Sequence, residues 1–171
     1  MVVQPNAERP SVGVPATAFL MGAFLSGFMM SLSAITIPVL LDTNTVSKDL
    51  LNQWLSLFHY GHTIIPTCAM GVAGLHVLTA LRRRAASRQK WRLYAAAAVS
   101  TVGIVPFTFI FMSPTNNTLF RLSETSAGTG DSLKNVRQIL IKWTWMHVAR
   151  ALFPLYGAVT SLVGVLQELG W

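Results

Sequence analysis

The sequence predicts an all-α integral membrane protein, a bundle of four transmembrane helices. Of the 171 residues, 52% are hydrophobic and only 11% are charged, and a soluble domain carries about twice that charged fraction. Mean hydropathy is +0.50. The apolar residues gather in four long stretches that hold almost no charge. The single cysteine, Cys68, permits no intrachain disulfide and no CxxC pair, which argues against thiol-oxidoreductase chemistry.

The four predicted spans cover residues 16–41, 54–81, 93–112 and 143–167. Each has at least the roughly 20 residues that a helix needs to cross the hydrocarbon core. Helices are expected because every backbone group in lipid must be hydrogen-bonded within its own segment. The first apolar run is too long for a typical signal-peptide core, so we expect it to be retained.

The basic residues predict the orientation of the bundle. Six of the thirteen lie between the second and third spans: Arg82, Arg83, Arg84, Arg88, Lys90 and Arg92. Lys and Arg concentrate on the cytosolic side of membrane proteins, so this loop and both termini are expected in the cytosol. The positive charge is therefore interpreted as a juxtamembrane loop and not as a nucleic-acid surface. In a eukaryotic cell the default membrane is the endoplasmic reticulum.

Outside the spans the composition predicts irregular structure. Residues 1–15 are polar and proline-containing and are expected to form a flexible cytosolic tail. Residues 123–132 are rich in Gly, Ser and Thr and predict a loop. The stretch 133–142 is expected to form a short helix on the membrane surface.

Several polar residues interrupt the apolar spans, and such residues usually face a bundle interior or a cavity. His59 and His62 are three residues apart in the second span, and Trp143, His147 and Arg150 form one helical stripe in the fourth. With four spans, the start of the second, the end of the third and the start of the fourth meet at one membrane face. We therefore expect these side chains to cluster there, together with Asn116 and Asn117 at the end of the third span.

Each of these residues also has a simpler interpretation. A lone histidine in a span commonly makes an interhelical hydrogen bond, which is the preferred interpretation of His76, and the two asparagines follow a proline and can cap a helix. Arg150 is the hardest to explain in this way, because no acidic residue lies in any span to pair with it. Its expected partners are carbonyl groups, a lipid headgroup or an anionic substrate.

These residues carry a resemblance to a known family. Pro-Thr-Asn-Asn at 114–117, Trp-x-x-x-His-x-x-Arg at 143–150 and His-Tyr-Gly-His at 59–62 followed by Pro66 resemble the anthrone oxygenases, small membrane proteins of fungal polyketide clusters. The resemblance covers most of the chain. It implies oxidation of a polyketide-derived anthrone to an anthraquinone with molecular oxygen, without flavin, haem or metal.

That chemistry predicts roles for the cluster. His59 or His62 is expected to be the base that removes a proton from the anthrone, and His147 and Arg150 are expected at the oxyanion. The Asn116 and Asn117 amides are expected to assist them. Four aromatic side chains are candidates to stack on the substrate rings: Trp143, Tyr60, Phe58 and Phe107.

Three alternatives stay open at this stage. His59, His62 and His147 are enough ligands for a metal site with an open position for oxygen. Haem bound between His62 and His147 is a second alternative. The third is a non-enzymatic four-span protein in which the cluster binds a ligand or relays protons. Small residues such as Gly157 and Ser161 permit close packing within the bundle or in a homo-oligomer.

Overall fold

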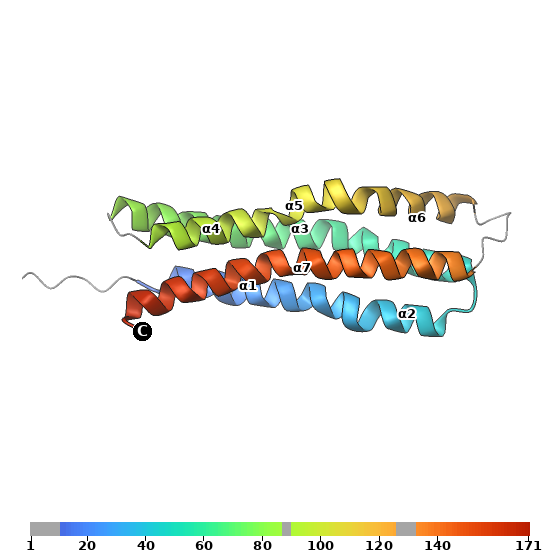
Figure 1. Cartoon of the computed structure of the whole chain (residues 1–171), viewed down its shortest axis with the longest axis horizontal. Helices are drawn as coiled ribbons and strands as arrows, with labels where there is room; N and C mark the ends of the chain where they lie inside the picture. The colour runs from blue at the N-terminus through green and yellow to red at the C-terminus, as the bar shows by residue number, and fades with distance from the viewer. Residues whose placement is uncertain (1–10, 87–89, 126–132) are drawn as a thin grey trace, which may run out of the picture.

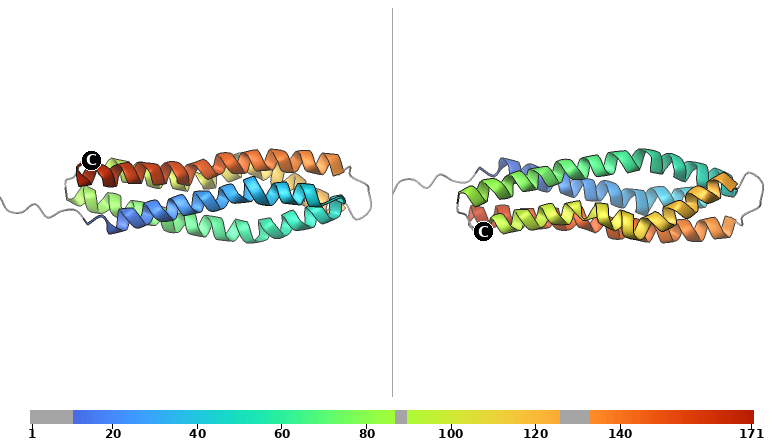
Figure 2. Two further views of the ribbon diagram at one scale, coloured as in Figure 1. Left: turned by 90° about the horizontal axis from the view of Figure 1, so that it is seen from below. Right: turned by 90° about the horizontal axis from the view of Figure 1, so that it is seen from above.

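The structure is a computed structural model that describes residues 11–86, 90–125 and 133–171. Within this part of the chain all regular structure is helical, and four continuous helical segments run side by side in alternating directions (Figures 1 and 2). Each is long and apolar enough to cross a membrane. The predicted all-α four-helix fold is therefore confirmed. The segments are Gly13–Thr43, Ser47–Ala85, Trp91–Glu124 and Leu133–Leu169.

Two of the four segments contain a π-helical turn. The first consists of α1 (Gly13–Ser31), the π-helical turn η1 (Leu32–Thr36) and α2 (Ile37–Thr43). The second is α3 (Ser47–Ala85) alone. The third consists of α4 (Trp91–Val102), α5 (Ile104–Phe107), the π-helical turn η2 (Thr108–Met112) and α6 (Ser113–Thr125). The fourth is α7 (Leu133–Leu169).

The helices extend past the apolar stretches from which the spans were predicted. α6 continues to Thr125, so Asn116 and Asn117 lie within a helix and do not end one. The predicted surface helix at 133–142 is wrong, because these residues form the first turns of the unbroken α7. Hydropathy marks the part of a helix that can lie in lipid, whereas the hydrogen-bonded helix continues into polar sequence.

The predicted tail and loop fall partly outside the described residues. Residues 1–10 of the tail lie outside them, and α1 already begins at Gly13. Of the loop predicted at 123–132, residues 126–132 lie outside them as well, and the residues before them end α6.

Two hydrophobic clusters form the core, at successive levels along the bundle. One is built around Trp54, Leu119, Leu140 and Trp143. The other is built around Met29, Ile65, Ile104 and Ala151. Large apolar side chains also cover the outside of the bundle, with Phe24 72% and Val99 75% exposed. An apolar exterior of this extent is typical of a surface that faces lipid.

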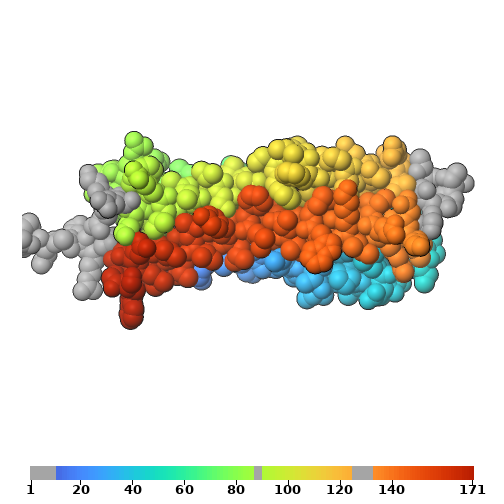
Figure 3. Space-filling model, viewed as in Figure 1, coloured from blue at the N-terminus to red at the C-terminus, as the bar shows by residue number. Residues whose placement is uncertain are grey.

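In the half of the bundle near the chain termini, α4 and α7 approach each other closely. A Cβ atom added to Gly157 would lie 2.5 Å from Thr101 Oγ1 and 2.9 Å from the carbonyl oxygen of Ala97. Only glycine fits this contact, as is common where membrane helices pack. The space-filling view shows α7, in orange and red, lying along the segment formed by α4 to α6 (Figure 3).

Candidate active site

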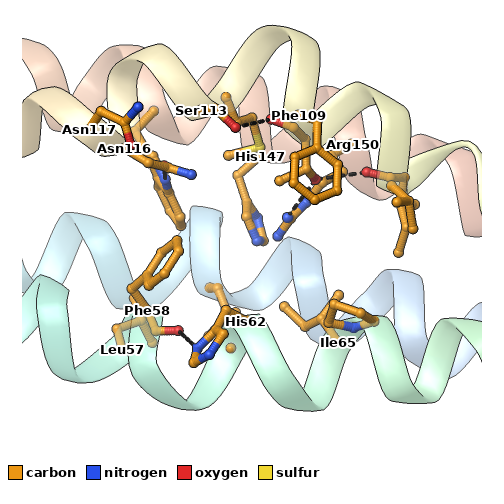
Figure 4. A pocket seen from close by; sticks show the side chains of 18 of the residues that line it. Leu57, Phe58, His62, Ile65, Phe109, Ser113, Asn116, Asn117, His147 and Arg150 are labelled. Atoms are coloured by element: carbon orange, nitrogen blue, oxygen red, sulfur yellow. Dashed lines mark hydrogen bonds between the residues drawn. The ribbon is translucent and has the colours of Figure 1, made fainter. Parts of the chain in front are cut away.

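A cavity of about 390 Å³ lies in the half of the bundle away from the chain termini, between α3 and the segment α5–η2–α6 (Figure 4). α7 and η1 close it from behind. Both hydrophobic clusters contribute to its walls, which are therefore mainly apolar. The lining residues are Leu32, Leu57, Phe58, Gly61, His62, Ile65, Pro66, Ile104, Val105, Thr108, Phe109, Met112, Ser113, Asn116, Asn117, Phe120, Trp143, His147 and Arg150.

His147 lies on the inner wall and is only 1% exposed. Its Nδ1 atom is hydrogen-bonded to the hydroxyl of Ser33, at 3.1 Å. The imidazole also stacks on Trp143, with the ring centroids 4.7 Å apart and the planes inclined by 22°. The indole Nε1 of Trp143 in turn donates a hydrogen bond of 3.0 Å to Asn116 Oδ1. Side chains from η1, α6 and α7 thus form one connected network that orients His147.

Arg150 lies one turn further along α7 and points into the cavity (Figure 4). Its Nη1 donates a hydrogen bond of 3.0 Å to the hydroxyl of Thr108, and its buried Nε has no partner among the described residues. Within those residues no carboxylate lies within ion-pairing distance of Arg150. A partly buried cation without a carboxylate counterion favours an anionic ligand or reaction intermediate at this place.

His62 lies on α3, across the cavity from His147 and Arg150 (Figure 4). Its Nδ1 is 3.0 Å from the carbonyl oxygen of Phe58. A carbonyl oxygen can only accept, so Nδ1 carries the hydrogen, and Nε2 of the neutral ring is an acceptor that lies 3.4 Å from the Thr63 hydroxyl. The ring stacks on the Phe58 ring, with centroids 5.4 Å apart and planes 5° apart. His62 is therefore held in the tautomer that a general base requires.

Seven of the ten predicted site residues line this cavity: His62, His147, Arg150, Asn116, Asn117, Trp143 and Phe58. The other three do not. His59 and Tyr60 are exposed and border a shallow hollow on the outside of α3, which His62 also reaches. Phe107 packs against Phe111 and Phe153 instead, with ring centroids 4.9 and 5.4 Å away.

The rotation of α3 about its axis explains why His62 lines the cavity and His59 does not. Each residue turns an α-helix by about 100°, and the inward face of α3 is marked by Trp54, Phe58 and Ile65. His62 lies at the edge of this face, whereas His59 lies about 60° further around the helix. Three-residue spacing places two side chains on neighbouring parts of the surface but does not indicate which of them faces inward.

Ser33 and Thr108 are the site residues that the sequence analysis missed. Each lies in a π-helical turn and contacts one of the polar residues of α7. Wide turns of this kind are frequent at functional sites. Apolar periodicity assumes a regular helix, so it carries no signal for them.

The three-histidine metal site considered from the sequence is not assembled. Among residues 11–86, 90–125 and 133–171, no group of three or more His, Cys, Asp or Glu side chains is arranged to hold a metal ion. His59 lies outside the cavity that His62 and His147 share.

The fold and the cavity define a class: helical proteins of the multi-pass membrane type that enclose histidine, arginine and amide groups between apolar walls. Comparison with known proteins narrows this class. The family model for anthrone oxygenase matches residues 54–160. The chain therefore belongs to the anthrone oxygenase family and is an oxygenase, as the resemblance implied.

Three relatives illustrate the similarity. Anthrone oxygenase dmxR16 of Cryptosporiopsis sp. is 44% identical over 95% of this chain and 94% of its own length. Anthrone oxygenase nsrD of Aspergillus novofumigatus is 46% identical over 91% of this chain and 95% of its own length. Anthrone oxygenase gedH of Aspergillus terreus is 46% identical over 84% of this chain and 93% of its own length. No solved structure matches the chain.

Proposed function

We propose that the protein oxidises the methylene group of a polyketide-derived anthrone to a carbonyl with molecular oxygen, and that the reaction takes place in the cavity. The similarity to named anthrone oxygenases supports the reaction. The proposed location of the reaction rests on one observation: His62, His147 and Arg150 line the same cavity, between apolar walls. One atom of O₂ becomes the carbonyl oxygen. The other leaves as water with the two methylene hydrogens.

The first step is removal of a methylene proton. The resulting carbanion is also an aromatic enolate, so a neutral imidazole is a strong enough base. We assign this step to His62, because the hydrogen bond from its Nδ1 to the Phe58 carbonyl leaves Nε2 unprotonated, and the substrate proton replaces the long 3.4 Å contact of Nε2 with the Thr63 hydroxyl. His62 then returns the proton to the reduced oxygen. Both methylene hydrogens end in the released water, so the cycle needs no net proton exchange with solvent.

The carbanion then donates its electrons to O₂, and a carbon–oxygen bond forms to give a peroxide. Loss of the second methylene hydrogen forms the carbonyl, breaks the oxygen–oxygen bond and releases water. Negative charge develops first on the enolate oxygen, where Arg150 and His147 act as donors. Asn116 uses its Oδ1 to accept from Trp143, so its amide nitrogen is left to donate to the peroxide, beside Asn117.

The apolar walls suit a flat ring system. Phe58 and Trp143 line the cavity from α3 and α7, and Phe120 approaches Phe58 with ring centroids 5.0 Å apart. A cavity of about 390 Å³ falls in the range of small-molecule sites, which lies at roughly 300–1,000 Å³. Exclusion of water from such a pocket strengthens the interaction of Arg150 with the developing anion.

We further propose that O₂ is the only co-substrate and that the protein needs no bound cofactor, because the substrate carbanion itself supplies the electrons. The proposed setting is the membrane of the endoplasmic reticulum, with both termini in the cytosol. The cavity then lies in the half of the bundle away from the cytosol. The basic residues at 82–92 support this orientation.

The test is oxygen uptake and quinone formation by purified protein in lipid nanodiscs supplied with emodin anthrone. We expect quinone to form far faster than it does spontaneously, with equal molar oxygen consumption, no stoichiometric metal and no effect of a chelator. A requirement for one metal ion or a haem absorption band would keep the reaction but contradict the cofactor-free mechanism. Folded protein that gives no acceleration would contradict the function.

Histidine variants test the site with a matched control. His62→Gln is expected to reduce turnover by about 100-fold or more, as loss of a general base does. Arg150→Met is expected to reduce turnover by a similar factor, because it removes an oxyanion donor. His59→Gln changes a histidine three residues from His62 that lies outside the cavity, and should keep most of the activity. Equal losses in both histidine variants would contradict the assignment.

A further inference from the structure

The cavity is open on one side. Three of its lining residues are exposed: His62 on α3, Phe109 on η2 and Asn117 on α6. By contrast, two lining residues of the opposite wall on α7, Trp143 and His147, are only 4% and 1% exposed, and the third, Arg150, is half-buried. The opening therefore follows the seam between the second and third helical segments.

The third segment changes direction beside this seam. α4 ends at Val102, and the amide of Gly103 is shared between the carbonyls of Val99 and Ser100. A Cβ atom at Gly103 would lie 2.7 Å from Phe153 Cδ1, so glycine is needed for this approach to α7. Beyond this point α5 and α6 lie offset from the line of α4 (Figure 1). α3 packs closely against α4 and touches α6 through Phe58 and Phe120, but it barely contacts η2, so the seam is open beside η2.

Phe109 forms the rim of the opening on the third segment, and the two exposed residues that follow it do not line the cavity but are apolar as well. Phe109 is 72% exposed, and the next two residues, Ile110 and Phe111, are 65% and 57% exposed. All three belong to a helical segment that is long and apolar enough to cross a bilayer. Exposed phenyl rings in such a segment face lipid more favourably than water.

We propose that the seam between α3 and η2–α6 is a lateral entrance, through which the aromatic substrate passes from the lipid bilayer into the cavity beside Phe109. This inference rests on the proposed function, because the substrate is a flat, apolar polyketide that partitions into lipid. A molecule entering there meets His62 at the rim, and Arg150 and His147 lie on the wall ahead. The entrance thus delivers the substrate between the base and the oxyanion donors.

The location of the opening is tested with a nitroxide spin label. Cys68, the only cysteine and an exposed one, is first replaced by alanine. Phe109→Cys is then labelled in nanodiscs, and the accessibility of the label to O₂ and to a water-soluble nickel chelate is measured. Lys48→Cys, at the exposed start of α3, provides the water-facing reference. We expect the label at 109 to be accessible to O₂ and shielded from nickel. Nickel accessibility equal to that at 48 would overturn a lipid-facing entrance.

Passage of the substrate is tested with the same labelled proteins. A label at 109 should lower kcat/KM by about tenfold or more, because it obstructs the approach to the catalytic groups. Phe111→Cys carries the matched label on an exposed phenylalanine of the same turn that does not line the cavity. It should leave kcat/KM within about twofold of the unlabelled protein. Equal effects at 109 and 111 would contradict the entrance.

A binding measurement separates this inference from the proposed function. The fluorescence of the anthraquinone product should be quenched more strongly by a nitroxide at 109 than by one at 111. Inactivity of the unlabelled protein would contradict the proposed function, whereas the accessibility and quenching results would still decide whether an aromatic ligand uses this opening. Equal quenching in an active protein would contradict the entrance alone.

Discussion

The imidazole of His147 and the guanidinium of Arg150 are each held by one hydroxyl group from a neighbouring segment. Ser33 binds His147 Nδ1, and Thr108 accepts from Arg150 Nη1. A histidine can act at a defined atom only when its other nitrogen is held, because that bond selects both tautomer and ring orientation. At the scale of single residues, these two hydroxyl groups are therefore positioning residues for the proposed oxyanion donors.

Replacement of Ser33 by alanine tests this role. Ser33→Ala should lower kcat by about tenfold and change KM little, because His147 keeps its place in the wall but loses its fixed orientation. The measurement is steady-state quinone formation per folded molecule. Ser26→Ala is the matched control, since Ser26 is a buried serine of the same segment that donates to the backbone carbonyl of Ala151. An equal loss of kcat in the control would contradict the positioning role.

At the scale of single elements, the π-helical turn η2 has two effects on the site. It directs Thr108 toward Arg150, and it places Phe109 at the opening of the cavity. A π-turn is equivalent to one extra residue in an α-helix, and the helix on either side keeps its orientation. The turn can therefore be removed with little effect on the packing of α4 and α6.

Deletion of Ile110 is expected to convert η2 into regular α-helix. The melting temperature in detergent should change by only a few degrees, because Ile110 is 65% exposed and both flanking helices keep their faces. Activity should fall by about tenfold or more, because Thr108 and Phe109 rotate away from their places in the cavity. Unchanged activity would show that the wide turn is not needed.

Deletion of Val99 is the control for deletion of Ile110. Val99 is also exposed, at 75%, but it lies in the regular helix α4. Loss of a residue there rotates the buried face of the helix away from its partners, so this deletion should prevent stable folding. A stable Val99 deletion variant would contradict the special role assigned to η2.

At the scale of the whole molecule, the bundle has two different ends. The end with the cavity holds Arg150, whose Nε has no partner among the described residues. In the other half both ring nitrogens of the buried His76 also lack a partner among those residues, so the interhelical hydrogen bond predicted for His76 is wrong. The end near the termini is closed by Arg83 of α3, whose guanidinium binds both carboxylate oxygens of Glu168 on α7 at 2.7 and 2.9 Å. The same guanidinium donates to the carbonyl oxygen of Ser11, just before α1. One largely buried ion pair thus connects the ends of three helical segments.

Removal of one partner of this pair should destabilise the protein. Arg83→Met is expected to cost about 3 kcal/mol in the free energy of unfolding, because it leaves the buried Glu168 carboxylate without a counterion. The double variant Arg83→Met/Glu168→Met should recover most of this loss, since no charge remains buried. Thermal unfolding in detergent measures both, and a double variant less stable than the single one would contradict this reading.

The sequence by itself determined the class of the fold and part of the site. Long uncharged stretches require helices in lipid, because no other local structure satisfies the backbone there. An ionisable side chain in a span is costly, so its presence indicates a function. Arg150 and His147 were predicted as site residues for this reason. Neither argument needs information about neighbouring segments.

The tertiary structure decided which side chains meet. It placed His62 at the cavity and His59 outside it, although both are polar and three residues apart, because the rotation of α3 is set by its packing. It also brought Ser33 and Thr108 to α7 through two wide turns. Ser33 and His147 are 114 positions apart in the sequence, and Thr108 and Arg150 are 42 positions apart. These contacts depend on the packing of whole helices, which local periodicity does not record.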